Sequence, residues 1–397
     1  AMLNSDGTID SGFEPGSGAN LNLNTLGVES NGNIIIGGNF TDYDGLYRQN
    51  IARVNANGSS GTGLDYTFGT NGRINSLVIQ NDGKIIIGGE FSSYSGVARN
   101  KLARINSNGS IDLTFNTGTG FNGNVMSVIL QNDGKILVGG DFTSFDGNTV
   151  NRLVRLNPNG SFDSSFNPGT GANSKIHKLV LHDGKLLVAG EFSSFNNIAR
   201  KSLARVDLNG VLDQTFDPGN TFEGVVYAIA PDNIGKILVG GFFTNNNGTI
   251  KNFTRINMNG TPDAGFNNGT GPNAFVKTIG IQQNGNIIIC GNFTSYNGLE
   301  RNRIARVLGG ENFTANVSPN SNYDLSIYPN PAKNILNINT SNPNGKIEIW
   351  SVTGKLVDVA QVKLKTSVIN LENILPGVYI VKYFLESKVA IKQLVIE

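Results

Sequence analysis

The sequence predicts an all-β chain whose first three quarters form a six-bladed β-propeller. A Gly-Gly-x-Phe-Thr/Ser box, degenerate in two copies, recurs every 50 or 51 residues, at 37–41, 88–92, 139–143, 189–193, 240–244 and 290–294. A repeat of this length holds about one four-stranded sheet, which must stack on copies of itself to bury its faces. No stretch of the repeats shows sustained helical periodicity, so helical repeats are excluded.

The third repeat shows the predicted strands in order: 125–131, 136–142, 152–156 and 161–166. The first of these is expected to place Val125, Ser127 and Ile129 on one side and Met126, Val128 and Leu130 on the other. The second is apolar throughout, which is typical of a strand covered on both faces. Asp133-Gly134 between them favours a tight hairpin, because both residues accept positive φ angles.

The turn between the third and fourth predicted strands places opposite charges face to face. Asn157-Pro158-Asn159-Gly160 favours a three-residue loop that pairs residues eight apart, so Arg155 faces Asp163. The same offset pairs Arg104 with Asp112, Arg205 with Asp213 and Arg255 with Asp263. In the first repeat an insertion lengthens the turn, but Arg53 and Asp65 are both present. Since functional sites are rarely repeated identically around a ring, we interpret these pairs as structural.

The first residues supply a phrase that the sixth repeat lacks. DGTIDSGF contains Asp10 and Phe13 of the fourth-strand phrase, whereas the sixth repeat stops after Arg306. We therefore predict that the N-terminal strand completes the last blade over residues 1–312, pairs Asp10 with Arg306, and removes the exposed sheet edges.

Composition narrows the classes of function. A net charge of +1 gives no electrostatic reason to expect nucleic acid as a partner, and no apolar run is long enough to span a bilayer. Cys290 is the single cysteine, which excludes a disulfide framework and predicts a small buried filler. The chain begins at Ala1 without a leader, so we expect that any signal peptide was removed or left out.

After residue 310 the repeats stop. Residues 313–323 are predicted to be a linker, and residues 324–397 a small Ig-like antiparallel sandwich. Its strand candidates are 336–338, 346–350, 356–362, 367–371, 378–384 and 389–395.

Several separated motifs in this segment resemble the type A C-terminal sorting domain of the type IX secretion system of Bacteroidetes. They are Tyr328-Pro329-Asn330-Pro331, Gly354-Lys355, Pro376-Gly377-Val378-Tyr379 and Lys392. The resemblance implies export across the outer membrane to the cell surface or medium. It also implies recognition by β-barrel outer-membrane components of that system and removal of the domain by its sortase.

The repeats themselves resemble the delta-60 repeat family of β-propellers. The phrases that carry the resemblance are DGKILVGGDF, RLVRLNPNGSFDSSF and FNPGTG, within 133–171. Because the function of that family is poorly defined, this resemblance implies a fold only.

The loop after each box offers candidate ligand-binding residues. One position carries an aromatic side chain in five repeats, with Asn246 as the exception, and four repeats add an arginine further on. These residues are Tyr43, Tyr94, Phe145, Phe195, Tyr296, Arg48, Arg99, Arg200 and Arg301. Aromatic and arginine side chains are enriched at binding hot spots. The alternative is that the aromatics wedge between blades while the arginines bond loop carbonyls.

Catalytic and cofactor candidates are few. His177 and His182 are the only histidines, and on one strand they are expected to point to opposite faces. No nucleophile motif, metal-ligand spacing or phosphate loop is present, so we expect neither a cofactor nor a metal. The favoured hypothesis is a non-enzymatic surface module that binds a glycan or protein, in adhesion or surface motility. The alternative is an extracellular polysaccharide hydrolase or lyase. A third possibility is that the propeller is cargo, with the secretion machinery as its main partner.

Overall fold

The computed structural model describes residues 1–4, 6–64, 68–232, 234–245, 248, 251–282, 284–308, 325–341, 343–351, 356–372, 374–385 and 388–397. These residues form strands and turns, in two compact units, 1–307 and 308–397. Among them, no helix has the length and hydrophobicity that crossing a membrane would require. The predicted linker and the two domain boundaries beside it fall on residues 309–324, outside the described residues.

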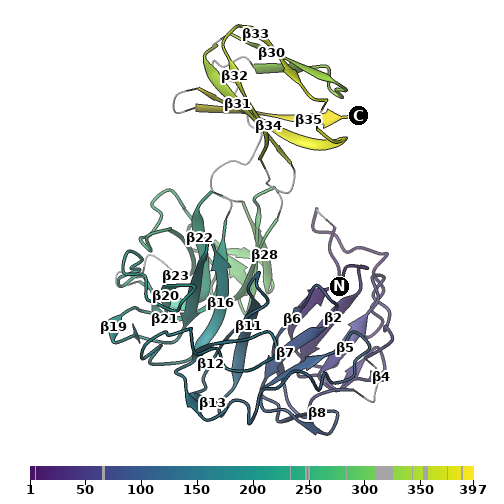
Figure 1. Ribbon diagram of the computed structural model, residues 1–397, viewed down its shortest axis with the longest axis vertical. Helices are drawn as coiled ribbons and strands as arrows, with labels where there is room; N and C mark the ends of the chain where they lie inside the picture. The colour runs from purple at the N-terminus through teal and green to yellow at the C-terminus, as the bar shows by residue number, and fades with distance from the viewer. Residues whose placement is uncertain are drawn as a thin grey trace. The chain divides into compact units, whose positions relative to one another are not determined.

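The first unit consists of six three-stranded antiparallel sheets that follow one another around a common centre, from β2 to β28 (Figure 1). In chain order the sheets are β1 (Leu23–Val28), β2 (Ile34–Gly38) and β5 (Ile51–Val54); β6 (Ile74–Ile79), β7 (Ile85–Gly89) and β10 (Leu102–Ile105); β11 (Val125–Leu130), β12 (Ile136–Gly140) and β15 (Leu153–Leu156); β16 (Ile176–His182), β17 (Lys185–Gly190) and β20 (Leu203–Asp207); β21 (Glu223–Pro231), β22 (Lys236–Thr244) and β23 (Lys251–Asn257); and β24 (Val276–Ile281), β25 (Ile287–Gly291) and β28 (Ile304–Val307). The all-β propeller prediction is confirmed.

In five of the repeats, the box is followed by a hairpin whose two strands are each two residues long. These hairpins are β3 (Asp42–Tyr43) with β4 (Leu46–Tyr47), β8 (Ser93–Tyr94) with β9 (Val97–Ala98), β13 (Ser144–Phe145) with β14 (Asn148–Thr149), β18 (Ser194–Phe195) with β19 (Ile198–Ala199), and β26 (Ser295–Tyr296) with β27 (Leu299–Glu300). The segments predicted as plain loops are therefore short paired turns.

The first glycine of the box lets neighbouring sheets approach. The first strand of each sheet, here called the inner strand, contacts the inner strand of the next sheet, from β1 through β24. A Cβ atom added to Gly88 would lie 2.4 Å from Cγ1 of Val125 on the next inner strand, and one added to Gly139 would lie 2.8 Å from Cγ2 of Ile176. A side chain at either of these two glycines would therefore push the sheets apart, whereas the fourth and sixth boxes accommodate Ala189 and Cys290 at this position.

The prediction of a full fourth strand in each repeat is wrong, because the pairing there is much shorter than predicted. In the third repeat it is reduced to one isolated bridge, between Leu156 and Phe162, and the sheet itself stops at β15. The side chain of Asp163 accepts the backbone N–H of Ser165 at 3.0 Å. Such an Asx turn redirects the chain and ends the pairing after one bridge.

The four predicted arginine–aspartate pairs are ion pairs in the structure. The Nε–Oδ2 distances are 2.8 Å for Arg104–Asp112, 2.7 Å for Arg155–Asp163, 2.9 Å for Arg205–Asp213 and 2.7 Å for Arg255–Asp263. Each guanidinium also lies over the phenylalanine three residues after the aspartate, 4.6 to 5.1 Å from the ring centroid. Arg104 further donates to Pro158 O of the next sheet at 2.6 Å, so one side chain ties a hairpin, an aromatic ring and a neighbouring sheet.

Arg53 has a different carboxylate partner. It forms a bidentate pair with Glu29, at 2.9 Å for both nitrogen–oxygen contacts. Asp65 lies outside the described residues.

The ion pairs predict that the propeller loses stability in acid. Burial alone would raise the pKa of Asp112 and of Asp163, but hydrogen bonds from a neighbouring hydroxyl, a lysine and the paired arginine hold both pKa values well below their usual range. A carboxyl with a depressed folded-state pKa contributes stability above its unfolded pKa of about 4 and loses it as the pH falls further. We expect the melting temperature of the propeller to be level from about pH 5 to 7 and to fall below about pH 4. A melting temperature that stays constant down to pH 2 would contradict this.

The two ends of the array of sheets differ from its interior. On β1, Leu23 and Leu26 are 49% and 63% exposed, whereas their equivalents Ile74 and Leu77 on β6 are buried. The sixth sheet contains β24, β25 and β28 only, and the first residues of the chain form a single bridge between Leu3 and Ile9.

The first segment lies within electrostatic reach of the sixth sheet. Hydrogen bonds from Thr8, and at longer range the charge of Arg306, hold the pKa of Asp6 below its usual range. Asp10 accepts the N–H of Gly12 at 2.8 Å. Closure of the ring by this segment, with the pairing of Asp10 and Arg306, stays a prediction.

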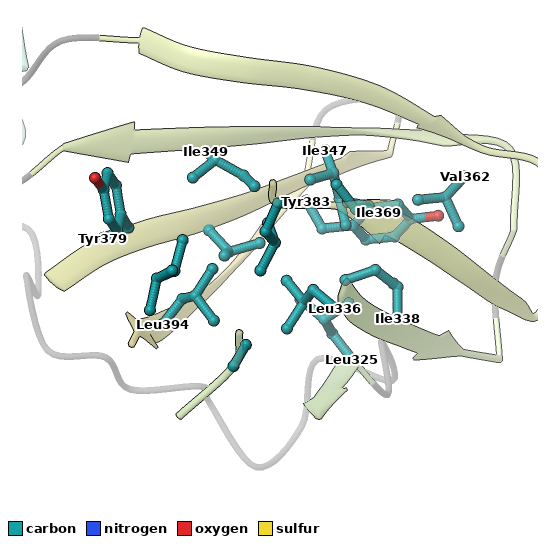
Figure 2. Packing of buried hydrophobic residues seen from close by; sticks show 14 residues of the cluster. Leu325, Leu336, Ile338, Ile347, Ile349, Val362, Ile369, Tyr379, Tyr383 and Leu394 are labelled. Atoms are coloured by element: carbon teal, nitrogen blue, oxygen red, sulfur yellow. The ribbon is translucent and has the colours of Figure 1, made fainter. Parts of the chain in front are cut away.

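The second unit is a sandwich of two antiparallel sheets. One contains β29 (Leu325–Tyr328), β30 (Ile335–Thr340) and β33 (Thr366–Asn370); the other contains β31 (Gly345–Ser351), β32 (Leu356–Val362), β34 (Gly377–Leu385) and β35 (Lys388–Ile396). Leu336 and Ile338 from the first sheet and Ile347 and Ile349 from the second are fully buried and point into one shared core (Figure 2).

The described sorting residues lie in the first loop of this sandwich and on β29, β34 and β35. Asn330 accepts the N–H of Val395 at 2.8 Å, and Ala332 N donates to Val395 O at 2.8 Å. Gly377 starts β34 opposite Ile396, and the Tyr379 hydroxyl donates to Leu375 O at 2.6 Å. Of the other motif residues, Tyr328 is the last residue of β29, Pro329 and Pro331 lie in that loop, and Lys392 lies on β35; Gly354 and Lys355 lie outside the described residues. The Tyr-Pro-Asn-Pro motif thus bonds to a strand about 65 residues later in the chain.

Candidate functional site

The repeated aromatic residues are interior side chains. Tyr43, Tyr94, Phe145 and Phe195 are at most 4% exposed. The hydroxyl of Tyr94 donates to Gly109 O at 2.7 Å. Rings in this position cannot be reached by a ligand without unpacking the hairpin, so the structure corrects the placement of these residues in an accessible pocket; Asn246 lies outside the described residues.

The repeated arginines bond their own loops. The Nη1 atoms of Arg48, Arg99, Arg200 and Arg301 donate to the carbonyl of the preceding residue at 2.7 to 2.8 Å. Arg48 and Arg200 are also buried. The alternative left open by the sequence, aromatics packed inside and arginines on loop carbonyls, describes these side chains.

Tyr296 differs from its equivalents in a way that can be measured. Its buried hydroxyl has no hydrogen-bond partner among the described residues, and burial raises the pKa of Tyr296 to about 12. We expect Tyr94→Phe to lower the free energy of unfolding by about 1 kcal/mol, because it removes a made hydrogen bond, and Tyr296→Phe to leave it unchanged. Chemical denaturation of both variants tests this. Equal losses would mean that Tyr296 has an acceptor, for which Gly7, the equivalent of Gly109, is the candidate in a closed ring.

A different set of side chains gathers where the inner strands begin. Each inner strand carries a β-bulge there, one residue that the register of the sheet skips. The bulge residues are Asn24, Asn75, Met126, His177, Tyr227 and Lys277. Bulges redirect a side chain away from the regular alternation and are common beside active sites. We call these six residues the collar.

The first half of the collar is structural. Asn24 donates to Ile74 O at 2.9 Å, and Asn75 donates to Val125 O at 3.0 Å, each reaching the inner strand of the next sheet. Asn75 also lies 3.4 Å from the sulfur of Met126. These two amide side chains therefore hydrogen-bond one sheet to the next.

The second half of the collar forms a cluster of polar and aromatic groups. His177 Nε2 lies 2.6 Å from Oε1 of Glu191, the variable residue of the fourth box. The His177 ring meets Tyr227 edge-on at 4.9 Å, and Lys277 Nζ lies 4.6 Å from the centroid of the Tyr227 ring. Phe275 packs against Tyr227 at 5.8 Å. Side chains of three successive sheets therefore meet at one place.

Burial is the main cause of the pKa shifts of the ionisable groups in this cluster. Burial lowers the pKa of His177, although the bond to Glu191 works in the opposite direction, so the imidazole is mainly neutral at pH 7. Burial and the charge of Arg73 lower the pKa of Lys277. Arg73 precedes the inner strand of the second sheet, so the array curves enough to bring the second and sixth sheets within electrostatic reach.

The remaining sequence candidates lie apart from one another. His182 Nε2 is 3.2 Å from Asp183, at the far end of β16 from His177. Cys290 is half-buried, and burial raises its pKa. No group of three or more His, Cys, Asp or Glu residues suited to a metal occurs in the described part of the chain.

Glu191, Tyr227 and Lys277 are functional candidates that were not predicted from the sequence. The available signal was a comparison among the repeats: the residue after the first apolar position of each inner strand changes from Asn to Met, His, Tyr and Lys, while its neighbours stay similar. A residue type kept in every repeat is typical of a role in folding. A position whose residue type changes while its neighbours stay the same is a candidate for ligand binding.

Two family models match the chain. A domain of unknown function described as the DUF5122 β-propeller matches residues 29–68, 80–115, 131–166, 182–216, 235–266 and 282–308, together more than half of the chain. The secretion system C-terminal sorting domain matches residues 326–397. No curated protein matches the chain.

Some solved structures are similar in fold. The extracellular domain of a hybrid two-component system from B. thetaiotaomicron shares 13% identity at a TM-score of 0.47, covering 94% of this chain and 56% of that one. PorZ, a surface component of the type IX secretion system of Porphyromonas gingivalis, shares 12% identity at a TM-score of 0.39, covering 100% and 61%. The chain thus spans less than two thirds of the length of either, and TM-scores below 0.5 carry no argument about its function.

The repeat phrases, the six sheets and the matched family model agree, as do the tail motifs and the matched sorting domain. The sorting domain directs the protein across the outer membrane, to the cell surface or the medium. The chain belongs to the DUF5122 β-propeller family and carries the C-terminal sorting domain of type IX secretion cargo.

Proposed function

We propose that this cargo protein is a surface module that binds a glycan or protein without altering it chemically, in adhesion or surface motility. The observation that carries the proposal is the collar, where bulges in successive sheets bring His177, Tyr227 and Lys277 together. Ligand sites combine aromatic side chains with a few placed polar groups, as this cluster does.

Because the cluster lies at the collar and not on the loops after the boxes, we expect a single binding site in place of six equivalent ones. Equivalent loops on every blade would support multivalent contact, but the aromatic and arginine side chains of those loops are bonded within the fold. The collar is asymmetric, so we propose one site per propeller. Export partners are a separate matter: we propose that β-barrel outer-membrane components and the sortase recognise residues 324–397.

A test is to display the secreted protein against glycan and extracellular-protein arrays, and to assay the same polysaccharides for release of reducing ends. We expect retention of at least one class of ligand and no release above background. Absence of any ligand would contradict a binding function.

A second candidate is a polysaccharide hydrolase or lyase. The neutral His177, held by Glu191 beside the phenol of Tyr227, favours this candidate because a base and a proton donor then lie together. Release of reducing ends that is lost in His177→Ala would establish it in place of the binding module.

A further inference from the structure

The fourth sheet departs from a bonding rule that the first three sheets obey. The residue after the bulge carries a hydroxyl in those sheets: Thr25, Ser76 and Ser127. Each hydroxyl accepts a backbone N–H from the next inner strand, at 3.2, 3.0 and 3.1 Å. In the fourth sheet this position is Lys178, which cannot accept a hydrogen bond. The fifth sheet has Ala228 at this position and lacks the hydroxyl as well, so the fourth sheet differs in placing a cation directly after the collar residue His177.

Two lysines at the collar lack a carboxylate partner. Neither Lys178 nor Lys277 forms an ion pair with a described residue, whereas nearby Arg73 lies 3.6 Å from Glu90. Both lysines reach solvent, yet protein crowds them enough that burial lowers both pKa values. An exposed cation without a counter-charge favours an anionic ligand, because the ligand supplies the charge-assisted hydrogen bond that no described carboxylate makes.

The surroundings of Lys277 add an apolar surface and a hydrogen-bond acceptor. The Tyr227 ring lies beside its ammonium group and packs against Phe275. Phe242, at 61% exposed, occupies in the fifth sheet the box position from which Glu191 reaches His177 in the fourth. Glu191 itself keeps about a third of its side chain open to solvent. A carboxylate, a flat C–H face and hydroxyl donors therefore all find partners at one site. A sugar acid offers all three, whereas an acidic peptide offers no array of hydroxyl donors for Glu191.

Building on the proposed function, we propose that the collar of the fourth to sixth sheets binds a uronic acid residue of an extracellular polysaccharide. Lys277 is the counter-charge of the sugar carboxylate. The aromatic group of Tyr227, Phe275 and Phe242 contacts the sugar ring, and Glu191 accepts a sugar hydroxyl.

The experiment measures binding of the full chain by calorimetry to polygalacturonate, alginate, carboxyl-reduced polygalacturonate and poly-glutamate. We expect binding to a uronate polymer and at least about tenfold weaker binding to the reduced polymer, the loss typical of removing a charge-assisted hydrogen bond. Lys277→Gln should lose a similar factor, Lys277→Arg should retain most of the affinity, and Phe242→Ala should weaken binding.

Matched controls separate the site from general effects of the substitutions. Lys251→Gln removes an exposed lysine on β23, and Tyr47→Ala removes an exposed aromatic on β4; both should bind like the unchanged protein. Melting curves establish that each variant folds.

The remaining outcomes overturn the inference in distinguishable ways. Equal affinity for charged and reduced polymers, or binding to poly-glutamate alone, would remove the uronate assignment and leave a binding module. Unchanged affinity in Lys277→Gln would show that the site lies elsewhere. No binding to any of the four polymers would overturn the inference, and the proposed function would then depend on the array result alone.

Discussion

Deleting residues 324–397 should abolish secretion, so that extracellular protein falls to background and the propeller accumulates in the periplasm. The expected effect is large because the deletion removes the whole sorting domain, which the matched family identifies as the export signal. The propeller is a separate compact unit with its own buried core, so it should stay folded when the tail is absent. Immunoblots of medium, surface and periplasmic fractions measure the distribution.

The control for this experiment is a full chain with an exposed substitution in the propeller. Tyr47→Ala alters a half-exposed side chain on β4 and leaves the sorting domain intact, so it should be exported normally. Protease resistance of the periplasmic propeller shows that retention does not come from misfolding. Normal extracellular levels of the truncated chain would refute a role for the tail in export.

The features that the sequence predicts well are those fixed over a short stretch of chain. The Gly-Gly-x-Phe box predicts strand spacing because a glycine is needed wherever Val125 or Ile176 of the next sheet approaches. The offset of eight between Arg155 and Asp163 follows from one tight turn. The fourth strand was predicted too long because the side chain of Asp163 turns the chain after a single bridge.

The candidate site escaped prediction because it depends on register between strands. His177 and Lys277 look like residues of an ordinary alternating strand. Only the pairing register, which skips each of them between two consecutive pairs, shows that they are bulged. The aromatic residues after the box led to the opposite error, a binding site predicted where the side chains are buried. A loop position suggests exposure, yet Tyr94 lies under its hairpin with its hydroxyl bonded. Ring closure, which the repeat count predicts, requires contacts between segments about 300 residues apart and stays a prediction.

Asp163→Asn should destabilise the propeller by about 3–5 kcal/mol, the cost typical of removing one partner of a buried ion pair. Asp163 is 6% exposed and receives Arg155 Nε at 2.7 Å and Lys135 Nζ at 3.0 Å. The amide keeps the shape of the carboxylate and can still accept from Ser165, so the substitution removes charge without leaving a cavity. Two cations then lie beside a neutral group.

The position of the single tryptophan makes this prediction specific. Trp350 lies on β31 of the sorting domain, so its fluorescence follows that domain, while far-UV circular dichroism is dominated by the larger propeller. In urea, we expect Asp163→Asn to shift the circular-dichroism midpoint and to leave the Trp350 midpoint unchanged. The Asp183 side chain is 78% exposed and lies at a positive φ that Asn tolerates. Asp183→Asn should therefore leave both midpoints in place, since its expected effect on the free energy of unfolding is at most about 0.5 kcal/mol. If Asp163→Asn were as mild as Asp183→Asn, the attraction within the pair would only offset its desolvation, and the packing of sheet on sheet would account for the stability of the propeller.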